Sequence, residues 1–280
     1  MVSCEHAGAA TYGVAQDGEY LQPPSDFLGR YPDIASVLRG GALGELAQVL
    51  GRGSRVAPAG TRALPVLPHP QKFICVGLNY KTHVAETKRD DSAYPALFVR
   101  FADSLAANGD LVLRPSFSER FDWEGELAVV IGRGGRAIPK AQAFEHVAGY
   151  ACFNDITVRD WQRHTHQWTP GKNFPGTGAL GPWLVTADEV PDVNALTLEA
   201  RLNGEVMQHA SLSDLIFTIP TLIEYISRFT PLSPGDVIAT GTPGGVGDRR
   251  DPPRYMKEGD VVEVEISGLG VLRNRIGTAA

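Results

Sequence analysis

Cysteine is scarce in this chain of 280 residues, and long apolar runs are missing. The three cysteines, Cys4, Cys75 and Cys152, lie far apart, which excludes a disulfide framework and predicts a reducing, cytoplasmic location. Cys75 and Cys152 stand in the apolar runs FICVG and YACFN, where we expect small core side chains. No apolar stretch approaches the roughly 18 residues that cross a bilayer, and the N-terminus lacks a signal-peptide pattern. We therefore expect a soluble protein with no membrane partner.

The chain also has no excess of positively charged residues. The chain has 26 Lys and Arg against 32 Asp and Glu, a formal net charge of −6. This excludes nucleic acid as a partner, because phosphate binding needs a basic stripe and the sequence has none. An acidic protein that binds an anionic small molecule must supply local positive charge, through a metal ion or a few placed Lys and Arg side chains. A chain of this length buries roughly 70–75% of its unfolded surface, so a metal ion would serve chemistry rather than folding.

The patterns divide the chain into a small N-terminal domain with its linker, residues 1–68, and a larger domain, residues 69–280. TYGVAQDGEYL has two strand-like pieces around an Asp17-Gly18 turn, and helical patterns follow near 27–38 and 43–50. Residues 51–70 are rich in Gly, Pro and Arg, a composition typical of a linker.

The larger domain consists mainly of short β-branched or aromatic runs bounded by turn residues. These runs are KFICVGL, PALFVRF, GDLVLRP, ELAVVIG, VAGYACFND, GPWLVT, LTLEARLNGEVMQ, DVIATGT and VVEVEIS. Asn203-Gly204 predicts a two-residue hairpin turn. Helices are expected at 80–86, 155–164 and 213–229, the last with Ser213 as its N-cap. Many strands and few helices predict an α+β fold that is mainly β, with a small N-terminal α/β domain.

Two glutamates open the strand-like run of DWEGELAVVI. Residues two apart in a strand point to the same face, so Glu124 and Glu126 project side by side. Such a pair is costly unless a cation lies between the carboxylates, and oxygen ligands suit Mg²⁺, Mn²⁺ or Ca²⁺. Asp155 ends the later apolar run GYACFND, and a return strand could deliver it beside the pair. The alternative is two solvated glutamates on a strand edge and an aspartate that caps a helix, and spacing alone leaves both open.

Several blocks between residues 72 and 276 carry a family resemblance. They are GLNYKTHVAE, DWEGELAVVIG, HVAGYACFNDITVRDWQ, TPGKNFPGTGALGPW, the NGE hairpin and PGDVIATGTPGGVG. In this order they resemble the fumarylacetoacetate hydrolase family, in particular its short bacterial acylpyruvases and 2-hydroxyhepta-2,4-diene-1,7-dioate isomerases. The resemblance implies a β-roll catalytic domain, commonly in homodimers, with Glu124, Glu126 and Asp155 as ligands of Mg²⁺ or Mn²⁺. The N-terminal domain resembles the variable extra domain of bacterial members.

The resemblance also implies roles for residues in the other blocks. Lys172, in a Pro-Gly-Lys turn, would bind a substrate carboxylate or stabilise developing enolate charge. Gln162 and Thr242 would contact the substrate. His83 and Glu86, three residues apart on one helical face, would belong to a lid and activate water, the carboxylate orienting the imidazole. Without the resemblance, the lysine and glutamine would be solvated residues and the His–Glu pair a surface pair.

Three further side chains are considered for the site. Arg100, at the end of ALFVR, is expected to face a substrate carboxylate. His164 and His166 have a metal-like spacing in RHTHQ but stand in an expected loop, so they would gate the substrate or lie on the surface. The animal tyrosine-pathway enzyme of the family has an additional ligand aspartate before the His–Glu block. This chain has FICVGLN there, so three protein carboxylates and water molecules would surround the metal.

Together these features predict a metal-dependent hydrolase that cleaves a carbon–carbon bond in a 2,4-dioxo acid, such as an acylpyruvate, in the catabolism of aromatic or related compounds. The same chelated enolate serves decarboxylases, isomerases and tautomerases of 2-oxo acids, and these are the alternative. The His83–Glu86 pair favours hydrolysis, because it can activate water. Residues 87–95 and 163–168 would select the distal end of the substrate.

Overall fold

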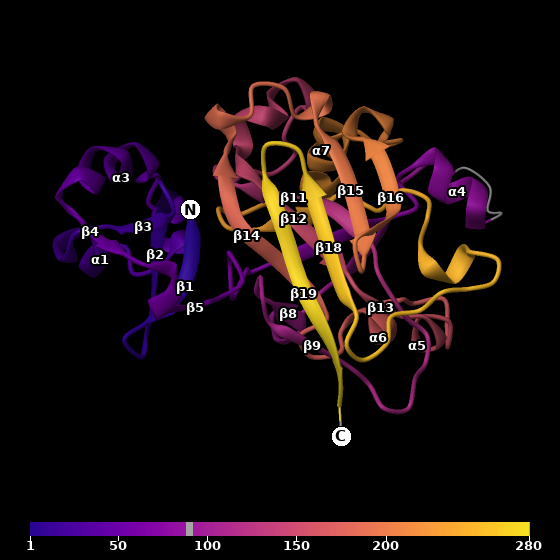
Figure 1. The fold of residues 1–280 in the computed structure, drawn as a ribbon. Coiled ribbons are helices and arrows are strands. Elements are labelled where there is room, and N and C mark those ends of the chain that lie inside the picture. Colours follow the sequence, from indigo (N-terminus) through magenta and orange to yellow (C-terminus); the bar gives the residue numbers. More distant parts are fainter. Residues whose placement is uncertain (88–91, 280) are drawn as a thin grey trace.

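The computed structural model of this chain describes residues 1–87 and 92–279. In these ranges the strands form three larger sheets and one short two-stranded pair (Figure 1). The predicted fold class, α+β and mainly β, is confirmed. None of the helices described is long and apolar enough to span a bilayer.

The N-terminal residues form a five-stranded sheet of order β4-β3-β2-β1-β5, at the left of Figure 1. Its strands are β1 (Val2–His6), β2 (Ala9–Gln16), β3 (Glu19–Gln22), β4 (Ser54–Val56) and β5 (Thr61–Ala63). The β2–β3 hairpin turns at Asp17-Gly18, as predicted. The linker prediction for 51–70 is wrong where it includes β4 and β5, because β4 pairs with β3 and β5 pairs with β1.

The helical pattern near 27–38 is two helices rather than one, α1 (Ser25–Arg30) and α2 (Ile34–Arg39). Pro32 separates them, since a proline disfavours helical conformation in the residue before it. The Asp33 side chain then caps α2 by accepting a hydrogen bond from the backbone N–H of Ser36 at 2.6 Å. The third helix, α3 (Leu43–Val49), agrees with the pattern at 43–50.

The larger part of the chain contains a seven-stranded sheet of order β7-β6-β17-β11-β12-β14-β8 and a five-stranded sheet of order β16-β15-β18-β19-β9. The first consists of β6 (Phe73–Gly77), β7 (Ala96–Val99), β8 (Leu105–Ala106), β11 (Gly125–Ile131), β12 (Val147–Asp155), β14 (Gly178–Thr186) and β17 (Val237–Ala239). The second consists of β9 (Leu111–Arg114), β15 (Thr197–Leu202), β16 (Glu205–Ser211), β18 (Val261–Ile266) and β19 (Gly270–Thr278). The short pair is β10 (Phe121–Asp122) with β13 (Thr157–Val158). Asn203-Gly204 joins β15 to β16, as predicted.

The helices of this part are α4 (Lys81–Thr87), α5 (Arg159–Gln162), α6 (Thr169–Lys172) and α7 (Ile219–Phe229). Of the three expected helices, α4 agrees, whereas the one expected at 155–164 is reduced to the single turn α5, because β12 and β13 take up its first residues. The helix expected from residue 213 begins at Ile219, with Thr218 at the N-cap and Pro220 in the first turn. Ser213 is therefore not its N-cap. The short 3-10 helices are η1 (Leu50–Arg52), η2 (Pro58–Gly60), η3 (Ala102–Ser104), η4 (Lys140–His146), η5 (Ala187–Glu189), η6 (Val193–Ala195), η7 (Leu212–Asp214) and η8 (Gly247–Arg249).

The two faces of the seven-stranded sheet pack against different layers. Leu127 and Val129 of β11 belong to a core shared with the five-stranded sheet β16-β15-β18-β19-β9. Their neighbours Ala128 and Val130 point the other way, into a second core that includes Phe27 of the N-terminal residues. The N-terminal residues are thus a layer on the larger sheet. The domain boundary at 68–69 stays a prediction.

Candidate metal centre and active site

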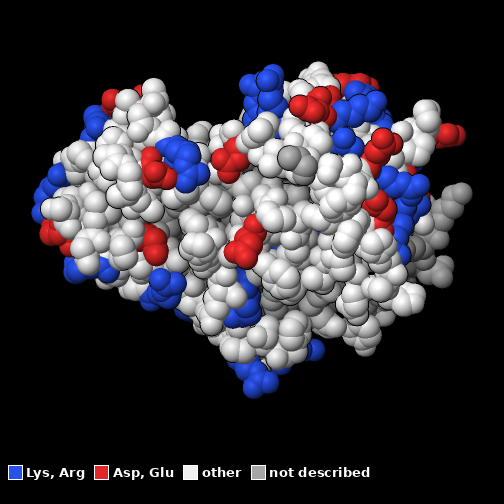
Figure 2. Space-filling model, turned by 90° about the horizontal axis from the view of Figure 1, so that it is seen from below, with Lys and Arg blue, Asp and Glu red and all other residues white. Residues whose placement is uncertain are grey.

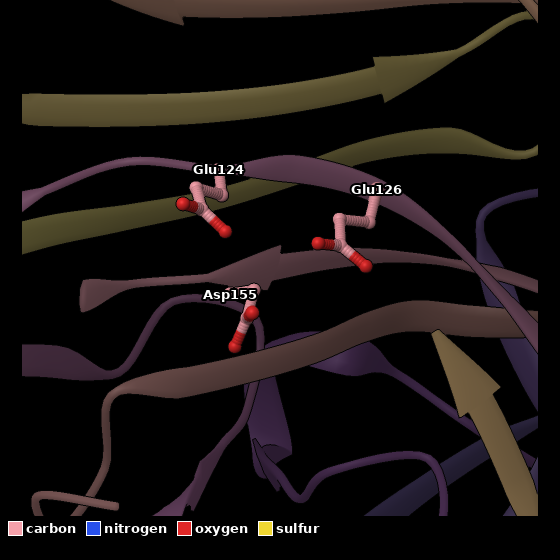
Figure 3. A group of neighbouring side chains, drawn as sticks. All are labelled: Glu124, Glu126 and Asp155. Carbon is pink, nitrogen blue, oxygen red and sulfur yellow. The ribbon is translucent and has the colours of Figure 1, made fainter. Parts of the chain in front are cut away.

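Three buried carboxylates meet at one end of β11 and β12. The strands are antiparallel with Glu126 opposite Phe153, and the N–H of Asp155 donates to the carbonyl of Glu124 at 2.8 Å. Residues opposite each other in neighbouring strands project from the same face. Glu124, Glu126 and Asp155 therefore extend toward a common space (Figure 3), and one carboxylate oxygen of each lies within 4.8 Å of the others. The structure brings together the three predicted ligands.

This donor set fits a hard divalent cation. The three residues are only 5%, 1% and 0% exposed, and all three offer carboxylate oxygens, the ligands preferred by Mg²⁺, Mn²⁺ and Ca²⁺. Three buried carboxylates at this separation repel one another and have lost their hydration, so the arrangement is costly without nearby positive charge. Two of the three find that charge in the protein itself.

Glu124 is held by cations on both oxygens. The ammonium of Lys172 donates to Oε2 at 2.7 Å, and Arg159 pairs with Oε1 at 2.6 Å. Burial by itself would raise the pKa of Glu124, but Lys172 and Arg159 outweigh it and lower this pKa to about 2. Glu124 is thus an anion at every physiological pH.

Glu126 has no such cationic partner among the residues that the structure describes. Burial, followed by repulsion from Asp155 and Glu124, raises the pKa of Glu126 well above its usual range. Lys172 and the hydrogen bond from the backbone N–H of Gly241, at 2.9 Å, offset only part of this. Glu126 is therefore the carboxylate that gains most from a cation placed between the three side chains.

Lys172 ends α6 and is buried, with its ammonium also 2.5 Å from Oδ2 of Asp155 and 5.0 Å from the ring centre of Phe98. Burial alone would lower the pKa of Lys172, yet Asp155 and Glu124 raise it overall. The side chain is thus a permanent cation beside the carboxylates. The sequence predicts a non-helical turn at Lys172, whereas the structure has the short helix α6 there.

His83 and Glu86 form the expected pair on α4. Nδ1 of His83 lies 2.6 Å from Oε1 of Glu86, and Oε2 of Glu86 accepts a hydrogen bond from the N–H of Gly245 at 2.8 Å. Glu86 thereby fixes the orientation of the imidazole and ties α4 to the glycine-rich turn after β17. With Nδ1 engaged, Nε2 is the nitrogen left for proton transfer.

One cavity is lined by most of these groups, although not by Asp155 or Glu86. Its volume, including the open mouth, is about 590 Å³, and His83, Lys172, Glu124 and Glu126 line it. Gln162 and Thr242 line it too. Of the segments expected to select the distal end of the substrate, Thr87, Arg163 and Trp168 are in the lining, while residues 88–91 lie outside the described part of the chain.

Thr242 and Gln162, the two predicted substrate contacts in the lining, differ in how many of their hydrogen-bonding groups are already used. The hydroxyl of Thr242 donates to the carbonyl of Gly125 at 2.9 Å and accepts from Gln208 at 2.8 Å. The side-chain oxygen of Gln162 accepts from Arg159 at 3.1 Å, which leaves its NH₂ group for a ligand. Gln162 is therefore the better placed donor to a substrate oxygen.

Arg100 is not where the sequence predicts it. It is buried outside the cavity lining, with Nε 2.5 Å from Oδ1 of Asp155 and Nη2 donating to the carbonyl of Ile156 at 2.6 Å. A third bond reaches the hydroxyl of Thr177 at 3.2 Å. The guanidinium compensates a buried carboxylate from behind, so it positions Asp155 and does not face a substrate carboxylate.

The sequence reasoning missed Arg159 and Asp122. Arg159 begins α5, lines the cavity and bridges the two acids, with Nε 2.8 Å from Oδ2 of Asp122 and Nη1 2.6 Å from Glu124. Its position three residues before Gln162 in RDWQ was the available signal, because that spacing places both on one helical face. His164 and His166 are exposed, and His164 packs against the ring of Trp161.

A mainly β fold with a buried carboxylate triad, and a cavity beside it lined by a lysine and by the histidine of a His–Glu pair, is typical of the fumarylacetoacetate hydrolase type of enzyme. The family described as fumarylacetoacetate (FAA) hydrolase C-terminal matches residues 72–277, and the chain belongs to this family.

Relatives and solved structures with several activities resemble the chain. The mitochondrial oxaloacetate tautomerase FAHD2A of Bos taurus is 42% identical over 226 residues, which cover 76% of this chain and 72% of that protein. Oxaloacetate tautomerase YisK of Bacillus subtilis is 41% identical over 215 residues, 75% of this chain and 71% of that protein. The fumarylacetoacetate hydrolase of Exiguobacterium antarcticum superposes with a TM-score of 0.88 at 33% identity, over 99% of each chain.

A maleylpyruvate hydrolase from Sphingobium sp. SYK-6, in complex with manganese(II) and pyruvate, superposes with a TM-score of 0.83 at 27% identity, over 100% of each chain. These findings do not confirm the predicted carbon–carbon hydrolase. The tautomerase relatives fit the alternative, an isomerase or tautomerase of a 2-oxo acid, better.

Proposed function

We propose that this chain is a tautomerase that interconverts the keto and enol forms of a small 2-oxo diacid of the oxaloacetate type. The observation that carries the proposal is the cavity lined by His83, Lys172, Glu124 and Glu126, with Glu86 bound to the imidazole of His83. The activities named for the relatives that match about three quarters of the chain support it.

We further propose Mg²⁺ or Mn²⁺ as the cofactor, held by Glu124, Glu126 and Asp155, with Ca²⁺ as the other cation that such oxygen ligands accept. Bound there, the cation would supply Lewis-acid stabilisation of negative charge on a 2-oxo acid. The manganese in the maleylpyruvate hydrolase structure supports this choice.

The side chains of the cavity suit the binding of an anionic acid. The ammonium of Lys172 is a fixed cation in a buried site, where its attraction to charge that develops on the oxygen at C2 is strong. The free NH₂ group of Gln162 can donate to the C1 carboxylate. Arg159, which contacts Gln162, holds that amide in place.

The reaction itself needs only proton transfer. The keto form loses a proton from C3, and the enol gains one on the oxygen at C2, so no bond between heavy atoms breaks and no water is consumed. His83 is the proton acceptor and donor in this proposal, because Glu86 orients its ring and it lines the cavity. A hydrolase would in addition need an activated water molecule.

The test follows oxaloacetate with the Mn²⁺-loaded enzyme. Ultraviolet absorbance of the enol reports tautomerisation, and we expect relaxation to equilibrium far above the buffer rate, abolished by a chelator. Release of CO₂ from oxaloacetate without faster tautomerisation would instead indicate a decarboxylase. Formation of pyruvate and a second acid from acylpyruvates, again without tautomerase activity, would restore the hydrolase prediction.

We also propose that the enzyme is a cytoplasmic homodimer. Large apolar side chains are exposed on β9 and the segments beside it, namely Phe101, Leu111, Leu113 and Phe117. Figure 2 shows that the molecule seen from below, the side on which β9 lies, has a mostly uncharged surface, with scattered Lys, Arg, Asp and Glu side chains among the uncharged ones. A second copy would cover this surface, and Leu111→Asp should shift the sedimentation coefficient from the value of a dimer to that of a monomer.

The proposed cytoplasmic location rests on the cysteines. All three are free and buried, which suits a reducing compartment.

A further inference from the structure

Two arginines share one carboxylate in the outer part of the cavity. Asp248 pairs with Nη2 of Arg163 and lies 3.5 Å from Nε of Arg249, and all three residues line the cavity. The other carboxylate oxygen of Asp248 accepts a hydrogen bond from the hydroxyl of Tyr255 at 2.9 Å. One carboxylate cannot neutralise two guanidinium groups, so positive charge is in excess here.

This excess lies away from the metal centre. The side chains of Arg163 and Arg249 are 42% and 34% exposed, whereas those of Glu124 and Lys172 are 7% and 1% exposed. The cavity therefore runs from a buried end with the carboxylates to an outer end with the arginines. A ligand bound by its 2-oxo acid group at the buried end would extend its distal group toward the outer end.

Arg249 has the better geometry for binding such a group. Among the described residues its side chain makes one ion-pair contact, the long one of 3.5 Å from Nε to Asp248, so both terminal nitrogens are available, whereas Arg163 is engaged through Nη2. A guanidinium with two free nitrogens binds a carboxylate in a bidentate manner.

The segment that carries Arg249 is anchored to the buried end. The backbone N–H groups of Gly247 and Asp248 donate to the side chain of Asp122 at 2.8 and 2.9 Å. Asp122 in turn binds Arg159, which pairs with Glu124. The two ends of the cavity are thus held at a defined separation, as the recognition of a ligand of fixed length requires.

We propose that Arg249 binds the second carboxylate of a diacid and so selects diacids over monoacids. The inference rests on the proposed function, because it places the 2-oxo acid end at the carboxylate triad. A monoacid such as pyruvate leaves Arg249 facing water and gains nothing from it.

The test uses malate and lactate, two unreactive 2-hydroxy acids with the same first two carbons, of which only malate has a distal carboxylate. Their dissociation constants are measured on the Mn²⁺-loaded enzyme by calorimetric displacement of oxalate. In Arg249→Gln we expect malate affinity to fall about tenfold or more, the effect of losing a charge-assisted hydrogen bond, and lactate affinity to change less than about twofold. Arg228→Gln is the control, since this exposed arginine of α7 pairs with Glu224 and does not line the cavity.

Three results would overturn the inference: equal affinity of the unmodified enzyme for malate and lactate, unchanged malate affinity in Arg249→Gln, or an equal loss for both acids. The last would mean that Arg249 only supports its loop. If the enzyme lacks tautomerase activity but shows a malate preference that depends on Arg249, the proposed function fails while the diacid site stands.

Discussion

Nε of Arg100 lies 2.5 Å from Oδ1 of Asp155, and both side chains are completely buried. The pair holds one oxygen of the third carboxylate of the triad, while Oδ2 of the same aspartate lies 2.5 Å from the ammonium of Lys172. A residue that was expected to bind the substrate thus sets the orientation of a candidate metal ligand.

Replacement of Arg100 should affect stability and metal binding together. In Arg100→Gln the buried Asp155 loses its compensating charge, so we expect the free energy of unfolding to fall by about 3–5 kcal/mol. Urea unfolding in the presence of a chelator measures this, and Mn²⁺ affinity, measured by calorimetry, should fall as well. Arg100→Lys keeps the positive charge, so it should lower the free energy of unfolding and the Mn²⁺ affinity less than Arg100→Gln does. A glutamine variant that matches the unmodified protein in both measurements would contradict the positioning role.

Metal binding should release a proton from Glu126. Its raised pKa means that the metal-free protein keeps a proton there to higher pH than an exposed glutamate does, and a divalent cation must displace that proton. For the same reason, the contribution of this group to metal-free stability is fully present below its unfolded pKa and is lost as pH rises through the raised folded value. Mn²⁺ affinity should therefore increase with pH.

Calorimetry in two buffers of different ionisation enthalpy counts the released proton. Glu126→Gln should bind Mn²⁺ more weakly and release fewer protons, and its metal-free melting temperature should depend less on pH. Equal proton release by the variant and the unmodified enzyme would assign the proton to another group.

The His83–Glu86 pair should control the rate and not metal binding. We expect His83→Gln to lower kcat for tautomerisation at least about 100-fold, because general acid–base catalysis is lost. Glu86→Gln should lower kcat by a smaller factor and shift the pH–rate profile, because the imidazole loses the carboxylate that orients it. Lys81→Gln, an exposed position on the same helix, is the control. Retention of the full rate by His83→Gln would exclude it as the proton-transfer group.

Gly77 should tolerate no side chain. A Cβ there would lie 2.2 Å from the ring of Trp168, and the indole would have to move within the wall of the cavity. Gly77→Ala should lower the free energy of unfolding by about 1–3 kcal/mol and raise KM. Gly60→Ala meets no atom within 4 Å and serves as the control. Urea unfolding with identical midpoints for both variants would show that Trp168 relocates freely.

Strand alternation and the family resemblance together predicted the meeting of Asp155 with the two glutamates, because the register of β11 and β12 follows from their apolar runs. Helical spacing likewise predicted the contact of His83 with Glu86. The side-chain orientation of Arg100 was not predictable from the sequence. It depends on the position of Asp155, a buried carboxylate from a distant part of the chain that lies near the end of β7. The strand β19 was missed because its inward Asn274 is polar, and it is buried only by donating to the carbonyls of Ala107 and Asp110.

The face of the sheet that bears the carboxylates continues beyond them as an apolar surface. Ala128 and Phe153 follow the ligands along β11 and β12, and the N-terminal residues cover them, although none of residues 1–63 lines the cavity. The N-terminal layer therefore closes the face of the sheet that bears the carboxylates. It keeps water away from this face, so the attraction between the buried carboxylate of Asp155 and the cations Arg100 and Lys172 retains the strength of a poorly polarisable medium.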